Sequence, residues 1–172
     1  MKSIKLSLTV LALLLSASVS TFAQTDVEAT ATMTATVNLT AGDVAFGEIE
    51  AGNSATMDVA GSVTSAGATG GSPSTGSITV ASGDPSGTIS MSWSATATLE
   101  NATGDAVTFT PAIDITQGAT AVGISSGSSF VHTTGTATIL TIYGALTAST
   151  EAGAFSTATG SGTALTFTAS YL

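Results

Sequence analysis

The sequence has no cysteine and almost no positive charge. Its 172 residues include two basic side chains, Lys2 and Lys5, against eleven Asp and Glu and one His. Without cysteine there is no disulfide to support a core and no lipoprotein anchor. Without further lysine or arginine the phosphate contacts of nucleic-acid binding are excluded, and an anionic membrane surface is disfavoured as a partner. Stability must therefore come from apolar packing and backbone hydrogen bonds.

Long apolar runs are also missing. Residues 6–15 form a short apolar run behind Lys2 and Lys5, and a small-x-small cleavage pattern ends at Ala23. This arrangement is typical of a secretory signal peptide and is too short to span a bilayer. We therefore predict a signal peptide over residues 1–23 and an exported protein that begins at Gln24. An uncleaved anchor is the alternative. The expected location is extracellular or on the cell surface, with the periplasm in transit.

Helical periodicity is absent outside the predicted signal peptide. Thr, Ser, Ala, Gly and Val dominate, and 19 Gly with 3 Pro punctuate the chain at short intervals. Apolar residues alternate with hydroxyl residues in about nine stretches, which is typical of short antiparallel strands. The sequence thus predicts an all-β fold, a single antiparallel β-sandwich over residues 42–172, with one core of ordinary size.

The longest alternating stretch precedes that domain. Residues 27–40 contain no Gly or Pro, and successive side chains of a strand point to opposite faces. We assign residues 24–41 to an N-terminal strand that either completes its own sandwich or is donated to a neighbour. Its apolar face, the predicted assembly strand, consists of Val27, Ala29, Ala31, Met33, Ala35, Val37 and Leu39.

Two further stretches stand out as strands. Residues 88–99 alternate around Trp93, the only tryptophan, which we expect to fill the core between two sheets. The chain ends in an alternating strand over residues 164–172, expected to be central to the domain. Its apolar face consists of Leu165, Phe167, Ala169 and Tyr171.

Candidate chemistry is weak. Residues 123–127 match the G-x-S-x-G nucleophile elbow, but no helix is predicted after them, and His132 is the only histidine. A lone histidine cannot build a histidine-rich metal site, so we expect a surface or strand residue there. Asp84, or Glu100 with Asn101 and Asp105, could offer oxygen ligands to calcium, although solvated acidic turns explain them more simply. We predict no catalytic residue, metal site or cofactor.

Several short motifs resemble a bacterial secreted family catalogued as domain of unknown function 4402. They are the stretches 44–49 with 51–52, 71–74 running into 78–80, and Gly153-Ala154-Phe155 followed by the last alternating strand. The resemblance covers about residues 37–172, and it departs from the family's pattern by an insertion over residues 156–162. It implies an exported, immunoglobulin-like sandwich of a surface or fimbrial kind and implies no catalytic residues.

The chain also looks like chaperone–usher pilus subunits. Those proteins carry an alternating N-terminal donor strand and a C-terminal alternating strand with a penultimate Tyr, which residues 27–39 and Tyr171 match. Their frequent cysteine pair is absent here. Two function classes follow. The first is a structural subunit of a surface or fimbrial assembly that polymerises with its own kind, or with related subunits, by strand addition. The second is a monomeric surface-binding module, for example an adhesin for a glycan or protein.

Overall fold

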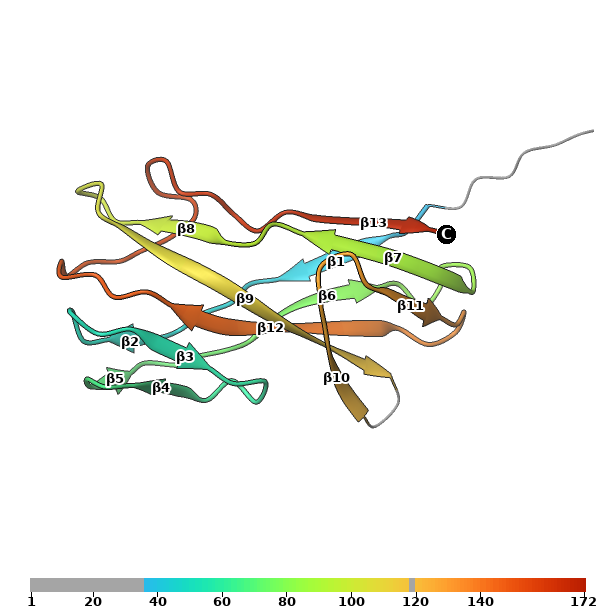
Figure 1. Cartoon of the computed structure of the whole chain (residues 1–172), viewed down its shortest axis with the longest axis horizontal. Coiled ribbons are helices and arrows are strands. Elements are labelled where there is room, and N and C mark those ends of the chain that lie inside the picture. Colours follow the sequence, from blue (N-terminus) through green and yellow to red (C-terminus); the bar gives the residue numbers. More distant parts are fainter. Residues whose placement is uncertain (1–35, 118–119) are drawn as a thin grey trace, which may run out of the picture. The chain divides into compact units, whose positions relative to one another are not determined.

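The computed structural model describes residues 36–117 and 120–172, all within the compact unit Thr34–Leu172. These residues form thirteen strands, all in antiparallel pairs, so the predicted all-β sandwich is confirmed (Figure 1). The predicted signal peptide lies outside the described residues. So do five members of the predicted assembly strand, namely Val27, Ala29, Ala31, Met33 and Ala35.

The larger sheet is organised around β12 (Thr138–Leu146), whose two edges both pair with other strands. One edge pairs with β6 and β3, and the other pairs with β9, which also carries β8 and β10. β1 pairs with β6, and β4 pairs with β3. The bounds are β1 (Leu39–Gly42), β3 (Ala55–Met57), β4 (Val63–Ser65), β6 (Gly76–Val80), β8 (Ala97–Glu100), β9 (Ala106–Gln117) and β10 (Thr120–Ile124).

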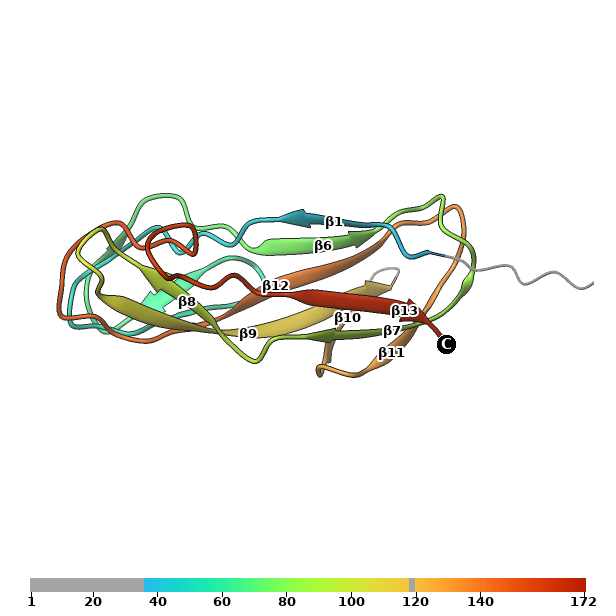
Figure 2. The same ribbon diagram turned by 90° about the horizontal axis from the view of Figure 1, so that it is seen from above.

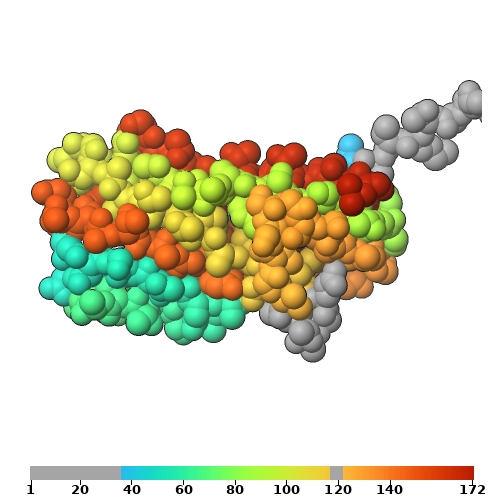
Figure 3. All heavy atoms as spheres, viewed as in Figure 1, coloured from blue at the N-terminus to red at the C-terminus, as the bar shows by residue number. Residues whose placement is uncertain are grey.

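A three-stranded sheet forms the opposite layer. Its central strand β7 (Gly87–Trp93) pairs with β11 (Ser129–His132) on one edge and β13 (Phe167–Tyr171) on the other. Figure 2 shows β1 and β6 on one side of the sandwich and β7, β11 and β13 on the other. In the space-filling view the β10–β11 stretch, in orange, stands in front of β12 (Figure 3). A small pair, β2 (Glu48–Ile49) with β5 (Thr69–Gly70), completes the described strands.

The core lies between the layers, and alternation places its side chains there. In β7, Ile89 and Met91 are fully buried, and in β12 Leu140 and Ile142 are buried, as their predicted parity requires. Val80, Ile113 and Phe109 join them from β6 and β9. Pro111 lies inside β9 between the residues that pair with β8 and those that pair with β10, where no strand needs its missing N–H.

Two expectations about buried residues need correction. The predicted strand over residues 88–99 is interrupted at residues 94–96, so that β7 and β8 belong to different sheets. Trp93, at the end of β7, is consequently only half-buried. It packs against Phe167 with ring centroids 6.1 Å apart instead of filling the centre of the core. His132 lies in a strand as expected, but it is fully buried.

Candidate functional site

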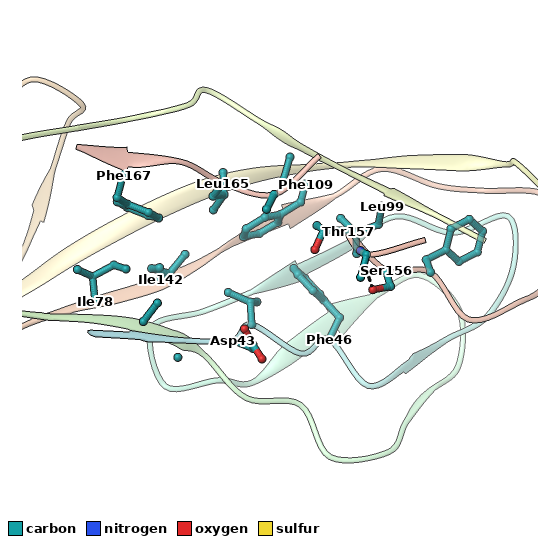
Figure 4. Close-up of a pocket in the computed structure, with 17 residues that line it drawn as sticks. Asp43, Phe46, Ile78, Leu99, Phe109, Ile142, Ser156, Thr157, Leu165 and Phe167 are labelled. Atoms are coloured by element: carbon teal, nitrogen blue, oxygen red, sulfur yellow. Dashed lines mark hydrogen bonds between the residues drawn. The ribbon is translucent and has the colours of Figure 1, made fainter. Parts of the chain in front are cut away.

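An open groove runs between the first and last described strands of the domain. We call it the β1–β13 groove. It encloses a hollow of about 490 Å³, and its two sides come from β1 with the chain that follows it and from the chain leading into β13 (Figure 4). Figure 2, which looks down on this side of the sandwich, shows the two strands in different layers. Its lining includes Ala41, Asp43, Val44, Phe46, Ser156, Thr157, Ala158, Leu165 and Phe167.

The floor of this groove is the hydrophobic core itself. Ile78 of β6, Ile142 of β12 and Phe109 of β9 all belong to the buried cluster, and all three line the hollow. Phe46 stacks edge-on against Phe109 with centroids 5.6 Å apart. Apolar side chains of an added segment would therefore extend the core, with a gain of about 25 cal/mol for each Å² of apolar surface removed from water.

β13 leaves a set of backbone groups without a strand partner on the groove side. Ser94 N donates to Thr166 O, and Leu172 N donates to Thr88 O, so the even-numbered residues of this stretch face β7. In an antiparallel pair the backbone groups alternate between the two edges. The N–H and C=O groups of Phe167, Ala169 and Tyr171 consequently point to the other edge, where no described strand pairs with them.

β1 presents a second open edge across the groove. Ala81 N donates to Asn38 O, which fixes the even-numbered residues of β1 as those bonded to β6. Leu39 and Ala41 therefore direct their backbone groups away from β6, and among the described strands β1 has no other neighbour. The groove is thus apolar at its floor and offers hydrogen-bonding backbone along both sides, which is the chemistry that an extended strand requires.

A polar clamp fixes the chain where it enters β1. The buried carboxylate of Asp84 accepts hydrogen bonds from Asn38 N at 2.7 Å and from Asn38 Nδ2 at 2.5 Å. The Asn38 side-chain hydrogen bond is the main reason that the pKa of Asp84 is lowered. Tyr171 lies at the same end and donates its hydroxyl to Pro85 O. Burial, followed by the charge of Asp84, raises the pKa of Tyr171.

A second hollow of about 660 Å³ continues the groove at its far end. Val44, Phe46, Leu99 and Phe155 line both hollows, so the two are contiguous. Glu48, Glu50 and Glu151 also line the second hollow. Glu50 Oε2 accepts a hydrogen bond from Ala68 N at 2.8 Å, so this carboxylate is already engaged by the protein.

The residues considered for catalysis or calcium are not assembled into a site. Ser125 lies in the turn between β10 and β11, where its N–H donates to Ser128 Oγ. Asp105 accepts from Asn101 Nδ2 and Thr103 Oγ1, which closes a turn. His132 Nδ1 lies 3.0 Å from Thr138 Oγ1, and its Nε2 is buried without a hydrogen-bond partner. Within residues 36–117 and 120–172 no three acidic or histidine side chains gather as metal ligands.

The structure brings the described members of the two predicted strands to one region. Val37 and Leu39, at the end of the predicted assembly strand, pack against the core, and Leu39 begins β1. Leu165 and Phe167 line the groove, and Ala169 and Tyr171 continue along its β13 edge. Sequence reasoning missed the clamp at Asp84 and the lining by residues 156–158. The alternation shows which face of a strand is apolar but not which edge lacks a neighbour.

Comparison of the chain with protein-family models, with curated proteins and with solved structures finds no match. Across the described part of the chain, no helix combines the length and the apolar character needed to cross a membrane.

Proposed function

We propose that the protein is an exported structural subunit of a cell-surface or fimbrial assembly, and that it polymerises by β-strand addition. In this proposal the alternating segment before β1 of one copy enters the β1–β13 groove of another. The observation that carries the proposal is the groove, where core side chains line a hollow between two strand edges that have no partners among the described strands. Strand addition satisfies both features at once, since main-chain bonds supply affinity and alternate side chains fill the hollow.

The predicted assembly strand has the composition that this groove requires. Its inward face over residues 27–35 is wholly apolar, and its other face carries Glu28 and four threonines if Thr36 is counted. At about 3.3 Å per residue, these nine residues extend about 30 Å. This segment is longer than the five residues of β13, so it can cover the whole open edge of that strand.

Filling of the groove by the same copy is disfavoured by the entry to β1. To return beside β1, the segment would need a tight hairpin just before Leu39. Such hairpins favour Gly, Asn or Asp in left-handed conformations, whereas residues 34–37 are Thr, Ala, Thr and Val. Asn38, the next residue, is held by Asp84 and Ala81. The segment of a second copy has no such turn to make.

Two neighbouring substitutions of opposite parity test the proposal. Met33→Asp would place a carboxylate in the groove of the partner copy, where an unpaired buried charge costs several kcal/mol. Thr34→Asp, the matched control, would leave its carboxylate near solvent. We expect Met33→Asp to abolish the series of oligomer bands on unboiled gels while the urea midpoint of the monomer stays at the parent value. Thr34→Asp should retain the bands.

Other outcomes of this experiment would contradict strand donation. If Met33→Asp lowers the stability of a monomer that never forms oligomers, the segment completes its own sandwich, and the surface-binding alternative gains support. If Met33→Asp and Thr34→Asp assemble equally well, the segment does not enter a groove at all. A third variant, Tyr171→Ala, should impair folding in either case because Tyr171 packs against the core and bonds Pro85.

A further inference from the structure

The chain that leads into β13 forms a loop beside the groove, where it leaves its pairing with β8. Thr98 of β8 pairs with Thr163, and Glu100 pairs with Ser156, both in antiparallel fashion. In a regular antiparallel ladder two steps along one strand match two steps along the other, so Glu100 would face Ser161. It faces Ser156 instead. Residues 157–161 therefore leave the ladder as five extra residues, which we call the 157–161 loop.

The 157–161 loop is held in place by one carboxylate. Glu100 Oε2 accepts from Ser161 N at 2.8 Å, and Glu100 Oε1 accepts from Ser161 Oγ at 2.7 Å. The Ser161 side-chain bond, followed by the backbone bond, lowers the pKa of Glu100. Gly162 N donates to Thr159 O within the turn. These bonds give the loop a defined conformation next to β8.

The position of the loop matters for any strand that is added to β13. Ser156, Thr157 and Ala158 line the hollow together with Leu165 and Phe167. Figure 4 shows Ser156 and Thr157 on the same hollow as these two apolar side chains. A strand bonded to the open edge of Phe167, Ala169 and Tyr171 that extends beyond Phe167 approaches Leu165 and then the loop. Either polarity of the added strand leads to the same obstruction.

The added segment needs such a stop because its sequence does not define its own register. Residues 29–35 read Ala-Thr-Ala-Thr-Met-Thr-Ala, so a slip by two residues keeps every side chain on its proper face. On the outer face it exchanges threonine for threonine, and on the inner face it exchanges Ala29 for Ala31 and moves Met33 by one place along the groove. The alternation itself is the same in both registers, so it specifies the register only weakly. Geometry in the acceptor has to supply the discrimination.

We propose that the 157–161 loop is a register stop for strand addition: it halts residues 27–35 of a second copy at one position in the β1–β13 groove. This inference rests on the proposed function and adds to it the element that selects the register. Glu100 acts as the positioning residue of the stop, since its carboxylate holds the loop at Ser161.

Disulfide trapping can read the register directly, because the chain has no cysteine of its own. The side chain of Thr168 is exposed on the solvent face of β13. The backbone groups of Thr168 point toward β7, with which β13 pairs. Opposite an added strand it would occupy a non-hydrogen-bonded site, with Cβ atoms about 4.5 Å apart, close to disulfide geometry. Three full-length double variants combine Thr168→Cys with Thr30→Cys, Thr32→Cys or Thr34→Cys. Thr64→Cys on β4, away from the groove, replaces Thr168→Cys in the controls.

We expect one of the three double variants to give covalent oligomers on non-reducing gels, and the Thr64→Cys controls to give none. The loop is then altered in two ways. Deletion of residues 157–161 restores a regular ladder, and Glu100→Gln weakens the loop's attachment without shortening the chain. Either change should spread the trapping to a second variant or shift it by two residues. Asp58→Asn, which also removes a carboxylate that holds a turn but lies between β3 and β4 outside both hollows, is the matched control and should leave the trapped pair unchanged.

The possible failures are distinguishable. If no double variant of the parent is trapped, strand addition at β13 fails, and the proposed function fails with it. If one pair is trapped and neither loop variant changes it, strand addition stands and the register stop is overturned. If the parent is trapped in several registers, the stop is likewise overturned. Urea midpoints measured on each variant show that a change in trapping does not come from unfolding.

Discussion

At Asp84, Glu100 and Asp105, hydrogen-bond donors take the place that basic side chains hold beside carboxylates in many proteins. Asn38 is the main donor at Asp84, Ser161 at Glu100 and Thr103 at Asp105, and in each case these bonds lower the pKa of the carboxyl group. Such bonds favour the charged form because protonation removes the acceptor charge that they stabilise. Each carboxylate thereby ties a turn or a strand entry to the sandwich.

Acid should therefore destabilise the protein. Since these pKa values are lower in the folded than in the unfolded state, the unfolded chain binds protons first as the pH falls. Their contribution is complete above the ordinary pKa of about 4 and is lost as the pH drops through the folded values. We expect the urea midpoint to fall steeply below about pH 4. Asp84→Asn should lower the midpoint at neutral pH but give a shallower acid decline. Parallel declines for both proteins would contradict this account.

At the scale of the element, β12 depends on one glycine. Gly144 has φ +141°, and a Cβ there would overlap Thr110 O and lie 2.9 Å from Ala112 N on β9. This position faces Pro111 across the ladder, where the two central strands approach closely. A side chain at Gly144 must push apart the two strands that carry the core residues Phe109, Ile113, Ile115, Leu140 and Ile142.

Gly144→Ala should therefore destabilise the fold by about 2–5 kcal/mol, from backbone strain together with overpacking. Gly104→Ala is the control, because Gly104 has φ +90° with open space around it. Its cost should be limited to the conformational term, about 1–2 kcal/mol. Urea unfolding measures both. Equal losses would mean that the β9–β12 spacing accommodates a methyl group.

The strands that could be predicted from the sequence are those in which apolar and polar residues alternate most regularly. The buried parity of β12 and of the early part of β7 follows from apolar residues at every second position. β13 alternates as predicted, but it is an edge strand with a half-buried apolar face and is not central to the domain as expected. The interruption after Trp93 did not follow from the alternation, because Ala95 and Ala97 continue the pattern although only Ala97 is buried. β10 was missed because its stretch is weakly patterned. The β1–β13 groove could not be predicted from the sequence, because the pairing of distant strands decides which strand edge has no neighbour.

At the scale of the whole molecule, negative charge dominates. The eleven carboxylates and two lysines give a net charge of −9, and loss of Lys2 and Lys5 with the predicted signal peptide would make it −11. Two copies of such a chain repel each other at long range, and no lysine or arginine offsets this in either one. Contact between copies has to overcome that repulsion through apolar burial and backbone hydrogen bonds.

Assembly should therefore accelerate as salt is added. Raising the ionic strength from about 0.01 M to about 0.15 M shortens the Debye length from about 30 Å to about 8 Å, which screens the repulsion. Light scattering of the purified monomer should show faster oligomer growth, and the melting temperature should rise slightly. Slower growth with salt would mean that attraction between opposite charges drives assembly, and this would contradict association between two acidic copies.

The clamp between Asp84 and Asn38 has a mechanical consequence. In the proposed filament, tension reaches each subunit through Thr36 and is directed along β1. The bonds from β1 to β6, together with those from Asn38 to Asp84 and Ala81, lie across that direction. Force then loads them in shear, all at the same time, instead of unzipping them one after another. The subunit would resist pulling at the point where its tether begins.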